Sequence, residues 1–220
     1  MAILTDPALA WAHLSSPQRL HLFALTEGTS TAVGRFHHVM VQLEKRGLAE
    51  RVLARWMPTA LGLQVATPPV LFLDQDGVVS RVTTVDAPAL SRIDEAAVRR
   101  LNPLVALGTR FVTSSTWRES YGPKRAASLI TGWLQTKGFE GVTSDATPVH
   151  ASQHRGEEIQ AWLDAQPIQP RAIAIVDDWE PMGHLTHRTV YTNEKILITS
   201  HDVARLGALL APLVSTQIHV

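Results

Sequence analysis

The stretch Pro69–Val79, PVLFLDQDGVV, decides the fold that we predict for this chain. Its first half is a continuous apolar run, which is typical of a strand buried on both faces of a parallel sheet. The run ends in Asp74 and Asp76, and Gly77 follows, whose missing side chain allows a sharp turn. Stability does not require two carboxylates at the end of a core strand. A site that holds a divalent cation and reacts with a phosphate does require them.

Strands and helices are predicted to alternate along the larger part of the chain, from residue 68 onward. The strands are expected at 70–73, 110–113, 139–142, 172–176, 189–192 and 196–198, and the helices at 93–107, 124–137, 155–165 and 201–210. This alternation is typical of βαβ units, in which helices cover both faces of a parallel sheet. We therefore predict that residues 68–220 form an α/β domain with a Rossmann-like, three-layer parallel sheet.

Two further strands also end in polar side chains. The segment FVTSSTWR, residues 111–118, ends its strand in hydroxyl groups, and AIAIVDDW, residues 172–179, ends its strand in Asp177 and Asp178. Ligands of open parallel sheets bind at the carboxyl ends of the strands, which meet at one edge. The hydroxyl groups and both acidic pairs are therefore expected to form one site.

These segments, in this order, resemble the motifs of the haloacid dehalogenase (HAD) superfamily of phosphohydrolases. FLDQDGVV resembles the first motif, FVTSSTWR the second, and IVDD the fourth. The tetrapeptide STWR and the segment RGEEIQAWL, residues 155–163, more narrowly resemble the HAD domain of Swiss-army-knife RNA-repair proteins, which process nucleic-acid ends. The resemblance extends from about Pro69 to Leu210. It implies a Mg²⁺-dependent phosphatase that acts through an aspartyl-phosphate intermediate.

The resemblance also implies roles for single residues, each of which makes chemical sense. Asp74 would be the nucleophile, and Asp76 would protonate the leaving oxygen and then activate water. Mg²⁺ would be held by Asp74, the Asp76 carbonyl and Asp177, with Asp178 beside it, because hard oxygen ligands suit this cation. Ser115 would hydrogen-bond the phosphoryl oxygens.

The lysine that is usual in this superfamily has no obvious counterpart here. Arg155, which opens the helix before the fourth motif, is the best positional match, and Lys124 is the alternative. Arginine binds phosphate through two N–H groups, so Arg155 in the place of the lysine is compatible with activity. Further candidates for substrate contacts are Ser114, Thr116, Trp117, Arg118 and Lys124. Trp117 and Trp179 each follow a site motif and could stack on a base, and burial beneath the site is the alternative.

Residues 1–67 have a different, mostly helical pattern. The expected elements are helices at about 15–28 and 31–45, a strand within 48–55 and a short helix to residue 65. The segments EKRGLAER, residues 44–51, and WMPTALG, residues 56–62, resemble the end of the recognition helix and the wing of winged-helix modules. This resemblance implies DNA contacts, for which the candidates are Arg35, His38, Gln42, Lys45 and Arg46. A small helical module that packs on the main domain or mediates homodimerisation is the alternative.

Composition excludes several classes of protein. Among the 220 residues, 20 are lysine or arginine and 20 are aspartate or glutamate, so no overall basic field attracts nucleic acid. The absence of cysteine excludes disulfides, thiolate metal sites and cysteine nucleophiles. The first residues lack the features of a signal peptide, and no apolar run approaches the roughly 20 residues that span a bilayer. A cytoplasmic protein with no membrane partner is expected.

The spacing of the motifs also bears on the substrate. Capped members of the superfamily insert a domain after the first motif or before the fourth. Here residues 80–94 and 138–155 are too short for a domain, so we predict an open site without a large cap. Such a site suits a phosphate on a large molecule, including nucleotides and nucleic-acid ends. The alternative function is a DNA-binding regulator or interaction protein whose HAD-like domain is degenerate and senses a ligand.

Overall fold

The computed structural model divides the chain into two compact units, Met1–Pro68 and Pro69–Val220. The residues that the structure describes are 14, 15, 18, 21, 22, 25, 37–52, 55–82, 89–150, 152, 154–167, 169–179 and 181–211. The helix predicted at 15–28 falls largely outside these residues. So does the first part of the helix predicted at 31–45, including Arg35.

From residue 37 to residue 66, the described part of the N-terminal unit forms a helix, a β-hairpin and a further helix. Helix α3 (His37–Lys45) is followed by the antiparallel strands β1 (Ala49–Val52) and β2 (Arg55–Pro58), and then by α4 (Ala60–Ala66). Thr59 caps α4, because its hydroxyl accepts a hydrogen bond from the backbone N–H of the third helical residue. The small core of this unit is formed by Leu14, Leu22, Leu25, Met40, Leu43, Leu48, Ala49 and Val65. The sequence predicted one strand here, whereas the structure has two that pair with each other.

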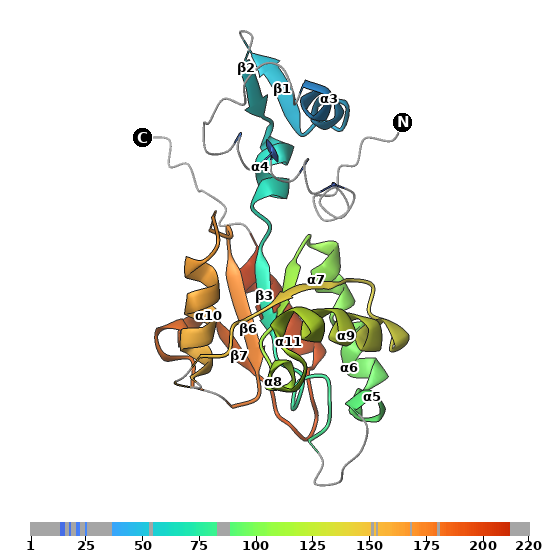
Figure 1. Ribbon diagram of the computed structural model, residues 1–220. Helices are drawn as coiled ribbons and strands as arrows, with labels where there is room; N and C mark the ends of the chain where they lie inside the picture. The colour runs from blue at the N-terminus through green and yellow to red at the C-terminus, as the bar shows by residue number, and fades with distance from the viewer. Residues whose placement is uncertain are drawn as a thin grey trace, which may run out of the picture. The chain divides into compact units, whose positions relative to one another are not determined.

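The C-terminal unit is built on a five-stranded parallel sheet with the strand order β5-β4-β3-β6-β7. Its strands are β3 (Val70–Leu73), β4 (Arg110–Thr113), β5 (Thr143–Ala146), β6 (Ile173–Asp177) and β7 (Thr189–Tyr191). Figure 1 shows helices on both sides of this sheet. The predicted α/β, Rossmann-like architecture is therefore confirmed.

The central strand β3 is buried on both faces, which is why it reads as an unbroken apolar run. Leu71 and Leu73 belong to the larger core, and Val70 and Phe72 belong to a second core on the opposite face. The larger core is covered by α6 (Glu95–Arg100), α7 (Asn102–Ala106), α9 (Pro123–Thr136) and α11 (Ser200–Leu210). The second core is covered by α10 (Arg155–Asp164) and the 3-10 helix η1 (Gly183–Arg188). Two separate cores on one sheet define the three layers.

Several predicted elements were wrong in detail. The strand predicted at 139–142 begins only at residue 143, because Gly138 (φ 88°) lets the chain turn and Phe139 packs into the larger core instead. The segment predicted as a strand at 196–198 is a turn closed by one isolated bridge between Asn193 and Leu197. The helix predicted at 93–107 is divided into α6 and α7, with Pro103 in the first turn of α7. The short helices α5 (Ala89–Arg92) and α8 (Trp117–Tyr121) were missed.

Candidate functional site

The carboxyl ends of three neighbouring strands bring the predicted site residues together. In the sheet, β3 lies between β4 and β6, and Leu73 is in register with Thr113 on one side and Val176 on the other. The next residue along each strand is therefore Asp74, Ser114 or Asp177. Parallel pairing in this register places the first, second and fourth motifs side by side.

The acidic residues form one compact cluster. Carboxylate oxygens of Asp74, Asp177 and Asp178 all lie within 4.8 Å of one another, and Asp74 and Asp177 are buried. Burial raises the pKa of Asp74 to about 8; the Arg155 charge opposes this rise and the Asp177 charge adds to it. Burial, together with the Asp177 charge, also raises the pKa of Asp178 to about 6. Carboxylate oxygens gathered this closely are hard donors of the kind that a divalent cation such as Mg²⁺ prefers, and a cation there would favour the ionised forms of Asp74 and Asp178.

Gly77 makes room for this cluster. Its backbone has φ 71°, a region that L side chains rarely adopt, and a Cβ there would overlap the carboxyl group of Asp178. The turn is held in place because the Gly77 N–H donates to the Ser80 carbonyl (2.8 Å) and its carbonyl accepts from the Thr192 hydroxyl (2.9 Å). The glycine of the first motif therefore determines where the last acid of the fourth motif can lie.

Arg155 is the cation beside the acidic cluster. It is the first residue of α10, and its Nη1 lies 3.7 Å from Asp74 Oδ1 while its Nε lies 4.0 Å from Asp177 Oδ2. The side chain is buried, and its Nη1 has no hydrogen-bond partner among the described residues. Gly156 permits this start of α10, because a Cβ there would collide with the backbone of Met182. Lys124 is exposed on α9, and no described contact joins it to Asp74.

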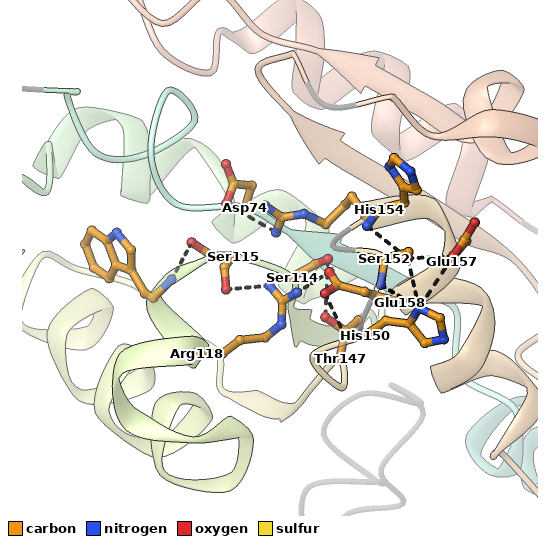
Figure 2. A network of polar contacts seen from close by, with 12 residues as sticks. Asp74, Ser114, Ser115, Arg118, Thr147, His150, Ser152, His154, Glu157 and Glu158 are labelled. Atoms are coloured by element: carbon orange, nitrogen blue, oxygen red, sulfur yellow. Dashed lines mark hydrogen bonds and ion pairs between the residues drawn. The ribbon is translucent and has the colours of Figure 1, made fainter.

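Ser115 and Arg118 hold the second motif against α10 (Figure 2). Ser115 is buried, and its hydroxyl hydrogen-bonds the Asp74 carboxyl and thereby helps to lower the pKa of that group. Arg118 was expected to contact substrate, but its side chain is only 1% exposed. It donates to the Ser115 carbonyl (2.5 Å) and forms an ion pair with Glu158. Arg118 is therefore a buried link between two parts of the site.

Asp76 is held by three side chains, of which Ser80 belongs to the same turn and Trp117 and Arg92 come from α8 and α5. Its Oδ2 accepts from Trp117 Nε1 at 2.7 Å, and its Oδ1 accepts from the Ser80 hydroxyl at 3.1 Å. Arg92 Nη1 lies 3.5 Å from the same Oδ1, and the Arg92 guanidinium lies 5.2 Å from the centre of the Trp117 ring. Sequence reasoning missed Ser80 and Arg92, because neither belongs to a motif.

The remaining predicted residues of the second motif differ in their surroundings. Ser114 is buried and accepts a hydrogen bond from the Thr147 hydroxyl at 3.5 Å, whereas Thr116 is exposed at the start of α8. Trp117 is buried, as the alternative interpretation had it, and Trp179 is 70% exposed. A hollow of about 530 Å³ lies along α10 and is lined in part by His150, His154 and His184. None of the acidic cluster lines it, so it is separate from the chemistry described above.

In the N-terminal unit, the described DNA-contact candidates lie on the outside of α3. His38, Gln42 and Lys45 are exposed and share one helix face, opposite the buried Val39, Met40 and Leu43. Arg46, just beyond the helix, is half-buried.

The fold and the acidic cluster together define the class of the C-terminal unit: an α/β phosphohydrolase domain of the HAD superfamily. Residues 70–203, more than half of the chain, match the family described as the HAD domain in Swiss Army Knife RNA repair proteins. The chain belongs to this family, and the resemblance inferred from the motifs is confirmed. No curated protein and no solved structure matched the chain.

Membership of this family indicates phosphatase-type hydrolase activity, a phosphorylated substrate and a general use of Mg²⁺. No helix in the described part of the chain is long and apolar enough to cross a membrane.

Proposed function

We propose that this protein is a Mg²⁺-dependent phosphatase that hydrolyses phosphoric monoesters through an aspartyl-phosphate on Asp74. The observation that carries this proposal is the buried cluster of Asp74, Asp177 and Asp178 at the carboxyl edge of the sheet, with Arg155 beside it. Perturbed carboxyl groups with a specific charge partner are typical of functional sites. The family match supports the same class of reaction.

The three acids of the cluster would hold the cation, with the Asp76 carbonyl as a further ligand. When bound, Mg²⁺ would offset the repulsion between the carboxylates and the incoming phosphate. Arg155 would pair with the phosphoryl oxygens, since its Nη1 is buried and lacks a described hydrogen-bond partner. The Ser115 hydroxyl would donate a further hydrogen bond to the same group.

The reaction would proceed in two displacements at phosphorus. A carboxylate oxygen of Asp74 attacks the phosphorus, the bond to the leaving oxygen breaks, and Asp76 gives that oxygen its proton. Asp76, now ionised, takes a proton from water, whose oxygen attacks the phosphorus and breaks the bond to Asp74. Inorganic phosphate leaves, and Asp74 and Asp76 return to their starting states. The hydrogen bonds from Trp117 and Ser80 would hold the Asp76 carboxyl in the orientation that both proton transfers need.

The proposed substrates are phosphate groups carried by nucleotides or nucleic-acid ends. The short segments at the two insertion points leave no room for a cap domain, which suits a large substrate. The family description, which concerns RNA-repair proteins, points in the same direction.

A phosphate-release screen tests this function. The full chain would be assayed with p-nitrophenyl phosphate, nucleoside monophosphates, sugar phosphates and oligonucleotides phosphorylated at either end, each with Mg²⁺ and with chelator. We expect Mg²⁺-dependent release that falls about 10³-fold or more in Asp74→Asn, because removal of a nucleophile leaves only residual catalysis. The matched control is Asp164→Asn, an exposed acid on α10 outside the cluster. Lack of release from every substrate in Mg²⁺ would exclude the proposed function.

DNA binding by the N-terminal unit is a second candidate function. It is favoured by the exposed face of α3, which carries His38, Gln42 and Lys45, and by Arg51 and Arg55, which are exposed on the hairpin that follows. In mobility-shift assays at low salt, Lys45→Ala and Arg51→Ala should each weaken binding, whereas Asp74→Asn should not. Lack of a shift on duplex DNA at low salt would rule this candidate out.

A further inference from the structure

Trp179 differs from the other tryptophans that the structure describes. Trp117 and Trp162 are buried and donate hydrogen bonds to Asp76 and Asp145. Trp133 packs edge-on against Trp117 at 5.7 Å. The Trp179 side chain is 70% exposed, and within the described residues its ring makes no ring contact and its Nε1 makes no hydrogen bond.

The backbone of Trp179 is nevertheless fixed to the acidic cluster. Its N–H donates to Asp177 Oδ1 at 3.1 Å, and Asp177 is itself part of that cluster. Only one residue separates the two, so the Cα of Trp179 lies at most about 7 Å from that of Asp177. The backbone that carries the indole therefore lies beside the acidic cluster, and the sugar of a nucleoside phosphate is long enough to bridge from a phosphate held there to a base near Trp179.

A second aromatic residue lies at the same edge of the sheet. Tyr191 ends β7 in register with Asp177, and its side chain is 38% exposed. The rim of the acidic cluster on the β6–β7 side thus presents aromatic surface to solvent, whereas the opposite side is formed by the buried Ser115 and Arg118. Exposed aromatic rings next to a charged site suit a ligand with a flat ring and an anionic group.

We infer that Trp179 is the surface on which the aromatic leaving group of the substrate stacks, so that the site prefers phosphate esters of nucleosides or other aryl-bearing alcohols over aliphatic ones. This inference rests on the proposed phosphatase function. Every base has a π-face, so stacking selects aromatic from aliphatic groups without selecting one base. Trp179 is thus a specificity-determining residue and takes no part in proton or phosphoryl transfer.

Two substrates that differ only by a base test this inference. Adenosine 5′-monophosphate and ribose 5-phosphate would be compared by kcat/KM in the wild type and in Trp179→Ala, Trp179→Phe and Ile196→Ala. The ratio of the two kcat/KM values should fall about 10-fold in Trp179→Ala, mainly through KM, and remain largely intact in Trp179→Phe. Ile196 is 62% exposed and apolar but not aromatic, so Ile196→Ala should leave the ratio unchanged. An unchanged ratio in Trp179→Ala would overturn the inference.

A binding measurement separates this inference from the phosphatase proposal. Asp74→Asn protein would be titrated with adenosine 5′-monophosphate and with ribose 5-phosphate in Mg²⁺ by isothermal titration calorimetry, which needs no tryptophan as reporter. The nucleotide should bind about 10-fold more tightly, and Trp179→Ala in the same background should remove the difference. Equal affinity for both ligands in Asp74→Asn would overturn the stacking role even if the protein is a phosphatase. Preferential nucleotide binding without turnover in the wild type would exclude only the phosphatase.

Discussion

Asp76 shows how strongly single contacts prepare one side chain for the proposed chemistry. Trp117 Nε1 donates to one of its oxygens at 2.7 Å, and Ser80 and Arg92 face the other. A carboxyl group held in this way cannot rotate freely, so its orientation toward a leaving oxygen is set before substrate binds. Such pre-orientation matters for proton transfer, which needs heavy atoms within hydrogen-bond reach.

The first prediction concerns Trp117→Phe, which keeps the aromatic packing but removes the donor to Asp76. We expect kcat to fall about 10-fold with little change in KM, because proton transfer is affected more than binding. The loss of one hydrogen bond should cost about 1 kcal/mol of stability. Steady-state kinetics and a thermal melt measure both effects.

Trp133→Phe is the matched control for this prediction. Trp133 packs against Trp117 and Tyr121 at 5.7 Å but makes no described contact with Asp76. It should lose little activity. Equal kcat values for the two variants would contradict a positioning role for the indole N–H of Trp117.

Between elements, the buried ion pair of Arg118 and Glu158 joins α8 to α10. The side chains are 1% and 3% exposed, and both make additional hydrogen bonds, Arg118 to the Ser115 carbonyl and Glu158 from the His150 N–H. This connection fixes the loop that carries Ser115 relative to the helix that carries Arg155. Two elements that are distant in sequence are thereby locked in one arrangement around the proposed phosphate position.

The second prediction is that Glu158→Gln destabilises the protein strongly, because it leaves the buried Arg118 charge without a counter-ion. The expected cost is about 3–5 kcal/mol, against at most ~0.5 kcal/mol for Glu95→Gln, whose partner Arg99 is 59% exposed. Equilibrium denaturation in urea measures both values. Similar midpoints for the two variants would show that the buried pair does not lock these elements.

For the whole molecule, the acidic cluster makes stability depend on pH. The pKa of Asp74 is raised to about 8 and that of Asp178 to about 6, whereas both groups have a pKa near 3.8 in an unfolded chain. Between about pH 4 and pH 8 the unfolded chain therefore releases protons that the folded protein keeps. Stability of the metal-free protein must fall as pH rises through this window.

The third prediction compares Asp74→Asn with the wild type in thermal melts at pH 4 and pH 8. Without metal, the variant should melt several degrees higher than the wild type at pH 8, because it lacks the Asp74 carboxyl group, whose burial makes ionisation costly, and the difference should shrink at pH 4. Mg²⁺ should stabilise the wild type, more at pH 8 than at pH 5, and should have little effect on the variant. If the melting temperature of the wild type were the same from pH 4 to pH 8, with and without Mg²⁺, the acidic cluster would not be a metal site.

Parts of the site could be predicted because their signals are local. Asp74 and Asp177 follow apolar runs directly, and Asp76 comes two residues after Asp74. The pairing of parallel strands brings the ends of such runs together, independent of the conformation of the loops. Arg92, Ser80 and Glu158 had no local signal. Arg92 reaches Asp76 across 16 residues and Glu158 reaches Arg118 across 40, so only packing of the chain brings each pair into contact.

The sequence by itself determined the parallel sheet, because apolar strand segments alternate with helical segments along the chain. It also determined the family and the acids at the strand ends, because the motifs that carry them can be read from the order of the residues. Only the tertiary structure decided between Arg155 and Lys124 as the cation that lies beside Asp74. It also decided that Trp117 is buried against Asp76 while Trp179 stays exposed beside the same cluster. The physical reason is that the burial of a side chain and its ion-pair partners depend on the residues that pack around it in space. The residues next to it in the sequence do not show which residues those are.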